Sequence, residues 1–220
     1  MEITNINDPT AGNRDVALSG DVIQGKTLDV AMVLDRSFSM NDPVTGGTKS
    51  SSLRNASELF IKLMRPDVND RIALVSYNTE STLIQPRIEL NIQNRQTLLD
   101  LVNQTPDLNP SGETSIAAGL LTGFNELNDG ARDVRAVLLV TDGKDNVSAQ
   151  TANGSVDLDT VQVPAGIGVH SVALGRAEDV DFVRLTNIAN TSGGSSVNTG
   201  NLTGLSQFDL EKFFLQAATA

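Results

Sequence analysis

The chain has 220 residues, 39% of them hydrophobic, and a formal net charge of −11 at pH 7. This length suits one large globular domain with a substantial core, and the acidic surface argues against nucleic-acid binding and membrane-surface binding. The lack of cysteine excludes a disulfide framework, a zinc–thiolate site and a thiol nucleophile. No stretch reaches the roughly 18 consecutive apolar residues of a membrane span. The N-terminus lacks the charged and apolar regions of a signal peptide, so we expect no membrane insertion.

Residues 1–26 are polar and interrupted by proline and glycine, which predicts an irregular N-terminal arm with at most a short edge strand at 16–18. Residues 27–220 are expected to form a single domain. Short apolar runs predict strands at 28–34, 71–77, 82–90, 135–140, 168–174 and 196–199. Helical spacing of apolar residues predicts helices at 50–64, 94–104, 115–127, 180–189 and 206–218.

This alternation predicts an α/β fold, a doubly wound, Rossmann-like and mostly parallel central sheet with helices on both faces. Pro86 marks the segment 82–90 as an antiparallel edge strand. The segment 146–166 fits either a short helix or an irregular crossover, and the pattern leaves both open.

Polar residues follow the first predicted strand in the stretch "VLDRSFSMND", residues 33–42. Asp35 ends the strand, and Ser37 and Ser39 follow at alternate positions, so in an extended loop the three side chains point the same way. No base is placed to activate either serine, which argues against a catalytic triad. One carboxylate and two hydroxyls are instead suitable oxygen ligands for a hard divalent cation.

Two further loops carry matching residues. "SGETS" places Thr114 just ahead of a helix, and "VLLVTDGKDN" places Asp142 at the end of the most apolar strand. Ligands of open α/β sheets bind at the carboxyl ends of the strands, where such loops meet. If the strands are neighbours, the loops supply two carboxylates and three hydroxyls, and water completes the six-oxygen arrangement that Mg²⁺ prefers.

The three stretches "DRSFS", "GETS" and "TDG" occur in the order typical of the von Willebrand factor type A family, the integrin I domain, and the chain resembles that family over roughly residues 28–216. "GETSIAAGL" and "GVHSVALG" also resemble the type A domain of calcium-activated chloride channel regulators, and type A domains of bacterial surface proteins are a similar candidate. The resemblance implies a metal-ion-dependent adhesion site formed by Asp35, Ser37, Ser39, Thr114 and Asp142.

In the family the two serines bind the ion directly, while the threonine and the second aspartate exchange between direct and water-mediated contact. The resemblance therefore implies a non-catalytic adhesion module that binds Mg²⁺, with Mn²⁺ or Ca²⁺ as alternatives. A protein partner would supply an Asp or Glu carboxylate as the remaining ligand. We further expect a module of a larger protein, located outside the cell or on its surface.

Some positions depart from the family pattern. Phe38 stands where many members have glycine, and it either shapes the rim of the site or packs inward. Asp42 matches the first acid of the second ion site of integrin β chains, but Pro43 replaces the second acid. We therefore expect no second ion site.

Several residues also have simpler interpretations. Asp35, its serines and Asp142 could serve only as turn and cap residues, and Asp145 and Asn146 are expected to be loop residues rather than ligands. Glu113 is expected to face solvent, and His170, the one histidine, to lie in the core.

The stretch "GGTKSS", residues 46–51, is not a phosphate-binding loop because Thr48 replaces the glycine required before Lys49. The alternative function is a Mg²⁺-dependent hydrolase or phosphotransferase, which needs a base or nucleophile close to the substrate. Lys49 and Lys144 are the only lysines in the candidate loops. We therefore expect that the protein is not an enzyme.

Overall fold

The computed structural model describes residues 26–44, 46–66, 68–129, 132–175 and 178–198. The expected N-terminal arm, its short strand at 16–18 and the closing helix at 206–218 lie outside the described residues, apart from residue 26 of the arm. Within the described ranges, no helix is both long and apolar enough to cross a membrane.

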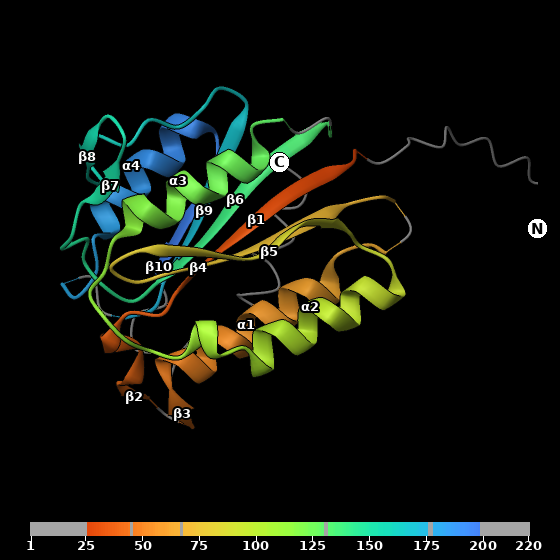
Figure 1. The fold of residues 1–220 in the computed structure, drawn as a ribbon, viewed down its shortest axis with the longest axis horizontal. Helices are drawn as coiled ribbons and strands as arrows, with labels where there is room; N and C mark the ends of the chain where they lie inside the picture. Colours follow the sequence, from red (N-terminus) through yellow and green to blue (C-terminus); the bar gives the residue numbers. More distant parts are fainter. Residues whose placement is uncertain (1–25, 45, 67, 130–131, 176–177, 199–220) are drawn as a thin grey trace, which may run out of the picture.

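Six strands form one sheet in the order β10-β9-β6-β1-β4-β5 (Figure 1). Neighbours run parallel except β4 and β5, which are antiparallel and contain register irregularities. The mostly parallel sheet with one antiparallel edge strand is therefore confirmed. The strands are β1 (Leu28–Asp35), β4 (Arg71–Tyr77), β5 (Ser81–Glu89), β6 (Val134–Thr141), β9 (Ile167–Ala173) and β10 (Ser196–Asn198).

Within the described residues, four α-helices cover the two faces of the sheet, and helices on both faces were expected. Figure 1 shows α1 and α2 on one face and α3 and α4 on the other. Their bounds are α1 (Lys49–Leu63), α2 (Ile92–Gln104), α3 (Ile116–Leu127) and α4 (Phe182–Ser192). Two 3-10 helices, Phe38–Asn41 and Pro106–Leu108, and the short strands β2 (Pro43–Val44), β3 (Gly47–Thr48), β7 (Ala149–Thr151) and β8 (Gly154–Val156) complete the described elements.

Strand β1 lies in the centre of the sheet, and all eight of its residues are buried. Successive side chains of a strand point to opposite faces. Met32 accordingly joins the core cluster that contains Leu53 of α1, whereas Val33 joins the cluster that contains Phe124 of α3. Burial on both faces explains why the sequence of β1 is a continuous apolar run instead of an alternating one.

The connection between β6 and β9 differs from expectation in part. Residues 149–156 form an antiparallel hairpin of β7 and β8 that was not predicted, because three-residue strands are too short to show periodicity. Residues 157–166 contain a turn and no helix, so the irregular crossover was the correct alternative. Helix α4 begins two residues later than predicted and ends at Ser192, where Gly193 adopts a left-handed φ of 79°.

The carboxyl end of β1 is a topological switch point. The chain leaves β1 through α1 to reach β4 on one side, and β6 lies on the other side. The register pairs Asp35 with Tyr77, and Leu34 with Val140. The three central strands therefore end side by side, at the place where ligands bind in open α/β sheets.

Helix α3 approaches this part of the sheet closely because glycine faces the strands. A Cβ atom at Gly119 would lie 2.6 Å from Cδ1 of Tyr77 and 2.8 Å from Cγ1 of Val33. Neither neighbour can move freely, since both Tyr77 and Val33 are fully buried.

We expect Gly119→Ala to destabilise the protein. Overpacking a core costs about 1–3 kcal/mol, and the better helix propensity of alanine returns only about 1 kcal/mol. Urea denaturation should show a lower midpoint for this variant. Asn125→Ala is the control, because Asn125 is exposed on the same helix. This variant should have an unchanged or slightly higher urea denaturation midpoint. An unchanged midpoint for Gly119→Ala would contradict the close packing of α3.

Candidate metal centre

The carboxylate of Asp35 lies at the meeting point of the three central strands. Its Oδ2 accepts hydrogen bonds from the Thr141 hydroxyl at 2.7 Å and from the Tyr77 hydroxyl at 3.2 Å. Its Oδ1 accepts from the Ser37 backbone N–H at 2.7 Å. Thr141 and Tyr77 are the last residues of β6 and β4, so the ends of both neighbouring strands and the following loop are all bound to one buried acid.

The two serines and Asp142 continue from this carboxylate as a connected chain of oxygen atoms. Ser37 Oγ and Ser39 Oγ lie 3.2 Å apart, and the Ser39 hydroxyl donates to Asp142 Oδ1 at 2.8 Å. The expected extended loop holds only as far as Ser37, because Ser39 lies within the 3-10 helix Phe38–Asn41. The turn of this helix still leaves the two hydroxyls adjacent. The first and third predicted motifs therefore meet.

Thr114 reaches the same place from the second loop. A Cβ atom built on Gly143 would lie 3.3 Å from Thr114 Oγ1 and 3.8 Å from Ser39 Oγ. Thr114, Ser39 and Asp142 also line one open cleft of about 490 Å³. The structure thus brings together all five residues that the sequence predicted as a ligand set.

Two residues that sequence reasoning left without a role hold the Thr114 loop. Asn146 Oδ1 accepts from the Thr114 N–H at 2.9 Å, and the Asn146 N–H donates to the Thr114 carbonyl at 2.9 Å. Asp145 Oδ1 accepts from the N–H of Ile116, the first residue of α3, at 2.7 Å. Asp and Asn side chains commonly bind backbone groups, but these partners lie about thirty residues away, beyond any local pattern.

The electrostatics of the site favour a cation. Burial, followed by the charge of Asp142, raises the pKa of Asp35 from 3.8 to about 6. Burial and the neighbouring Asp35 also raise the pKa of the Tyr77 hydroxyl, which therefore stays protonated as a donor. A dication would relieve the repulsion between the two acids, so the residues present fit a hard divalent ion.

Hydroxyl groups are essential to such a site in this chain. Among the described residues, no three His, Cys, Asp or Glu side chains gather closely enough to hold a metal ion. An ion beside Asp35 and Asp142 would therefore depend on Ser37, Ser39 and Thr114 for further ligands. Hydroxyl and carboxylate oxygens match the preference of Mg²⁺ and Ca²⁺.

Lys49 is a component of the site that sequence reasoning missed. Its ammonium donates to Asp142 Oδ2 at 2.7 Å and to Asp42 Oδ2 at 3.0 Å. No local pattern signals this contact, because Lys49 and Asp142 are 93 residues apart.

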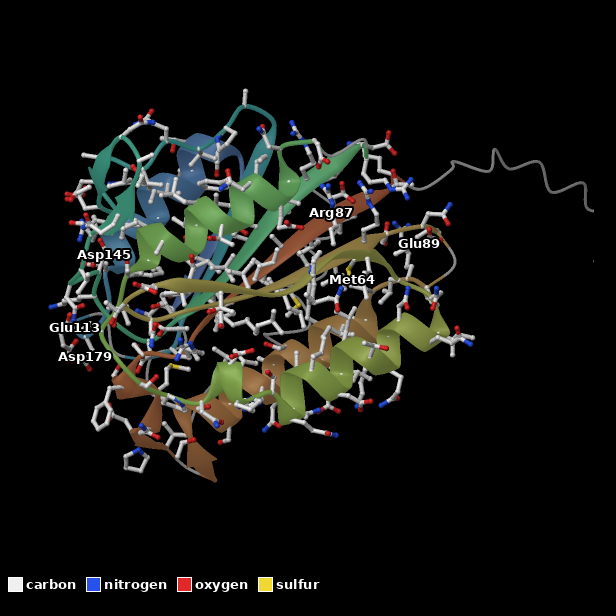
Figure 2. The ribbon with its side chains drawn as sticks, in the orientation of Figure 1. Met64, Arg87, Glu89, Glu113, Asp145 and Asp179 are labelled. Atoms are coloured by element: carbon white, nitrogen blue, oxygen red, sulfur yellow. The ribbon has the colours of Figure 1, made fainter. Side chains whose placement is uncertain are left out.

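The remaining candidates are placed as follows. Phe38, between the two serines in sequence, is 70% exposed, so it does not pack inward. Glu113 is exposed, as expected, and Figure 2 shows it with Asp145 and Asp179 at the end of the molecule opposite Arg87 and Glu89. His170 is buried, with Nδ1 3.0 Å from Ser195 Oγ, which confirms the expected core position.

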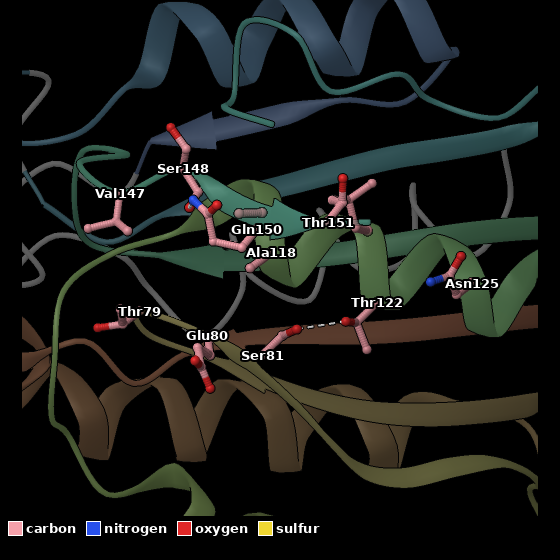
Figure 3. A pocket seen from close by; sticks show the side chains of 12 residues that line it. Thr79, Glu80, Ser81, Ala118, Thr122, Asn125, Val147, Ser148, Gln150 and Thr151 are labelled. Carbon is pink, nitrogen blue, oxygen red and sulfur yellow. Dashed lines mark hydrogen bonds between the residues drawn. The ribbon is translucent and has the colours of Figure 1, made fainter. Parts of the chain in front are cut away.

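A second hollow, of about 420 Å³, lies between α3, the β7–β8 hairpin and the loop before β5 (Figure 3). A hydrogen bond of 2.7 Å joins the Ser81 and Thr122 hydroxyls within it. Of the described residues that line it, Glu80 alone is ionisable. The cleft at the strand ends is therefore the stronger candidate for a functional site.

The raised pKa of Asp35 predicts how the stability of the metal-free protein depends on pH. Folding raises this pKa, so the contribution of Asp35 to stability is fully present below pH 3.8 and is lost as pH rises through about 6. The rise of this pKa from 3.8 to about 6 corresponds to about 3 kcal/mol. Asp35→Asn carries no charge, and its amide NH₂ can donate to the Thr141 and Tyr77 hydroxyls, which can turn to accept.

In chelator, Asp35→Asn should therefore gain stability relative to the wild type as pH rises from 4 to 7. Chemical denaturation at several pH values measures this difference. A difference that stays constant over this range would contradict the raised pKa.

Comparison with known proteins identifies the family of the chain. No curated protein sequence matches the chain, but the family model described as "von Willebrand factor type A domain" matches residues 30–144. That segment contains Asp35, Ser37, Ser39, Thr114 and Asp142, and it spans more than half of the chain.

Solved structures share the fold. The D319A mutant of the PilB minor pilin from Streptococcus sanguinis is 19% identical with a TM-score of 0.67, and the match covers 90% of this chain and 62% of that chain. A von Willebrand factor type A protein from Catenulispora acidiphila is 18% identical with a TM-score of 0.68, covering 88% and 42%. Proximal thread matrix protein 1 from the mussel byssus, "with zinc occupied MIDAS motif", is 18% identical with a TM-score of 0.67, covering 88% and 46%.

The present chain thus spans less than two thirds of each of these three proteins, and identities this low demonstrate a shared fold alone. The family-model match and the fold together show that the chain belongs to the von Willebrand factor type A domain family.

Proposed function

We propose that the chain is a non-catalytic adhesion module that binds a divalent cation and, through it, an acidic residue of a partner protein. One observation carries the proposal. Asp35, Ser37, Ser39, Thr114 and Asp142 come from three separate loops and converge at the carboxyl end of the central strands. These residues would hold the ion, and the ion would supply an electrophilic centre for a foreign carboxylate.

The composition of the ligand set supports recognition of an acid. Three of the five ligands are neutral hydroxyls, and Asp35 is already bound by three donors from the protein. If only one carboxylate contacts the ion directly, the ion keeps a net positive charge and attracts an Asp or Glu from the partner. Mg²⁺ is our first choice because oxygen ligands and water suit it, with Mn²⁺ or Ca²⁺ as alternatives.

The rim supports a protein partner. Phe38 exposes a large apolar surface directly between the two serines in sequence, and exposed aromatic residues are common anchors at protein interfaces. Because the three neighbours described above are longer than this chain, we propose that it is a module of a larger protein. The minor pilin and the byssus matrix protein among them favour an extracellular or cell-surface location.

The chemistry of the cleft favours binding over catalysis. The Lys49 ammonium is bound by two carboxylates, and His170 is buried in β9 and does not line the cleft. A Mg²⁺-dependent hydrolase or phosphotransferase would need a base or nucleophile there. Turnover of phosphatase or esterase substrates that requires Mg²⁺ and is lost in Lys144→Met would reverse this assignment.

Calorimetric titration with Mn²⁺ tests the ion site. Ser39→Ala removes a predicted ligand and should weaken Mn²⁺ binding by at least about tenfold, equivalent to about 1.4 kcal/mol. Asp35→Ala should abolish measurable binding. Asp35→Asn should do the same while keeping hydrogen-bond partners for the Thr141 and Tyr77 hydroxyls, so a loss in both variants is not a folding defect. Ser155→Ala is the matched control, since Ser155 is exposed on the β7–β8 hairpin, and undiminished affinity in Asp35→Ala would reject the site.

Thr114→Ala tests the second half of the proposal. It should reduce Mn²⁺ affinity less than Asp35→Ala does, but reduce capture of acidic peptides more than it reduces ion binding. The measurement is binding to a peptide array in which each Asp or Glu peptide has an Asn or Gln counterpart, in Mn²⁺ and in chelator. Equal losses of ion and peptide binding would argue against a switching role for Thr114.

A further inference from the structure

Lys49 occupies a position in α1 that local energetics do not favour. It is the first residue of the helix, next to the cap residue Thr48, and no acid stands in the first turn. The positive end of the helix dipole lies there, so a cation is unfavourable and an anion favourable. A lysine at such a place is expected to extend into solvent, yet its side chain is only 15% exposed. The reason for its position must therefore lie outside the helix.

The hairpin before α1 directs Lys49 toward the cleft. Strands β2 and β3 pair antiparallel, with Pro43 opposite Thr48, and the Lys49 N–H donates to the Asp42 carbonyl at 3.1 Å. The Asp42 carboxylate also accepts from the Lys49 ammonium, although Asp42 itself is 59% exposed. Asp42 thus binds both the backbone N–H and the ammonium of Lys49, and this places the ammonium within hydrogen-bond distance of Asp142.

The contact at Asp142 is directly relevant to ion binding. Asp142 Oδ1 accepts from Ser39 and Oδ2 accepts from Lys49, and the Asp142 side chain has no exposure to solvent. A divalent ion that uses this carboxylate meets an ammonium already bound to it. Two cations on one carboxylate repel each other, and burial strengthens that repulsion.

We infer that Lys49 is a tethered counter-cation that competes with the divalent ion for Asp142 and thereby sets the ion affinity of the site. Without the ion, it neutralises the acid that lies beside Asp35. With the ion, the ammonium can release Asp142 and keep its bond to Asp42, which is exposed and can follow it. This inference rests on the proposed function, because it assigns a residue that tunes the same ion site.

Calorimetric titration with Mn²⁺ tests the inference on three variants. Lys49→Met and Lys49→Gln both remove the charge, and the glutamine keeps a donor near Asp142, so each should bind Mn²⁺ at least about tenfold more tightly than the wild type. Lys144→Met is the matched control. Lys144 lines the same cleft and is exposed. Lys144→Met therefore changes the net charge by the same amount without removing the contact with Asp142. Its Mn²⁺ affinity should stay within about threefold of the wild type.

Stability without metal provides a second readout. In chelator, Lys49→Met should unfold at a lower temperature than the wild type, because Asp142 and Asp35 then lack a counter-charge. Added Mn²⁺ should raise the unfolding temperature of this variant more than that of the wild type. If Lys49→Met fails to fold in chelator, Lys49→Gln gives the same comparison.

The outcomes separate the two proposals. If the wild type binds Mn²⁺ and both Lys49 variants bind it with equal or lower affinity, the inference is wrong and the ion site stands. If Lys144→Met gains as much Mn²⁺ affinity as the Lys49 variants do, the inference is also wrong. Binding that is detectable only after Lys49 is replaced would support the inference in its strongest form. No binding in the wild type or in either Lys49 variant would overturn both.

Discussion

The buried carboxylate of Asp35 is the constraint on which the site depends. A charged group at the end of a fully buried strand must be satisfied by donors, and Asp35 obtains them from Ser37, Tyr77 and Thr141. These donors fix the ends of β4 and β6 and the start of the first loop relative to β1. The geometry of the cleft therefore follows from the hydrogen-bond donors that the buried Asp35 carboxylate requires.

The hydroxyl groups allow the same arrangement to serve two states. A serine or threonine hydroxyl can donate to a carboxylate or offer a lone pair to a cation. The Ser39 hydroxyl donates to Asp142, and the same oxygen would turn its lone pairs inward on ion binding. A site made only of carboxylates would lack this freedom and would repel itself more strongly without metal. A site with few charged ligands and several hydroxyl ligands would therefore let the domain stay folded both with and without the ion.

The sequence predicted the fold and the meeting of the five candidate residues because both depend on local patterns. Apolar runs and helical spacing identified the elements, and the rule that loops meet at the carboxyl ends of strands placed Asp35 and Asp142 together. The β7–β8 hairpin was missed because its strands are too short to show a period. Lys49 and Asn146 were missed for another reason. Their partners, Asp142 and Thr114, become neighbours only after the sheet has formed.

The net charge of −11 gives the ion a further role in the proposed function. An acidic module repels an acidic partner, and the cleft carries three further acids, Asp42, Glu178 and Asp179, against one exposed lysine, Lys144. The Lys49 ammonium cannot offset this, because it is bound by two carboxylates within the cleft. A divalent ion bound at the strand ends would add positive charge where a partner carboxylate has to approach. The same negative field that concentrates cations near the cleft would therefore make partner binding conditional on the ion.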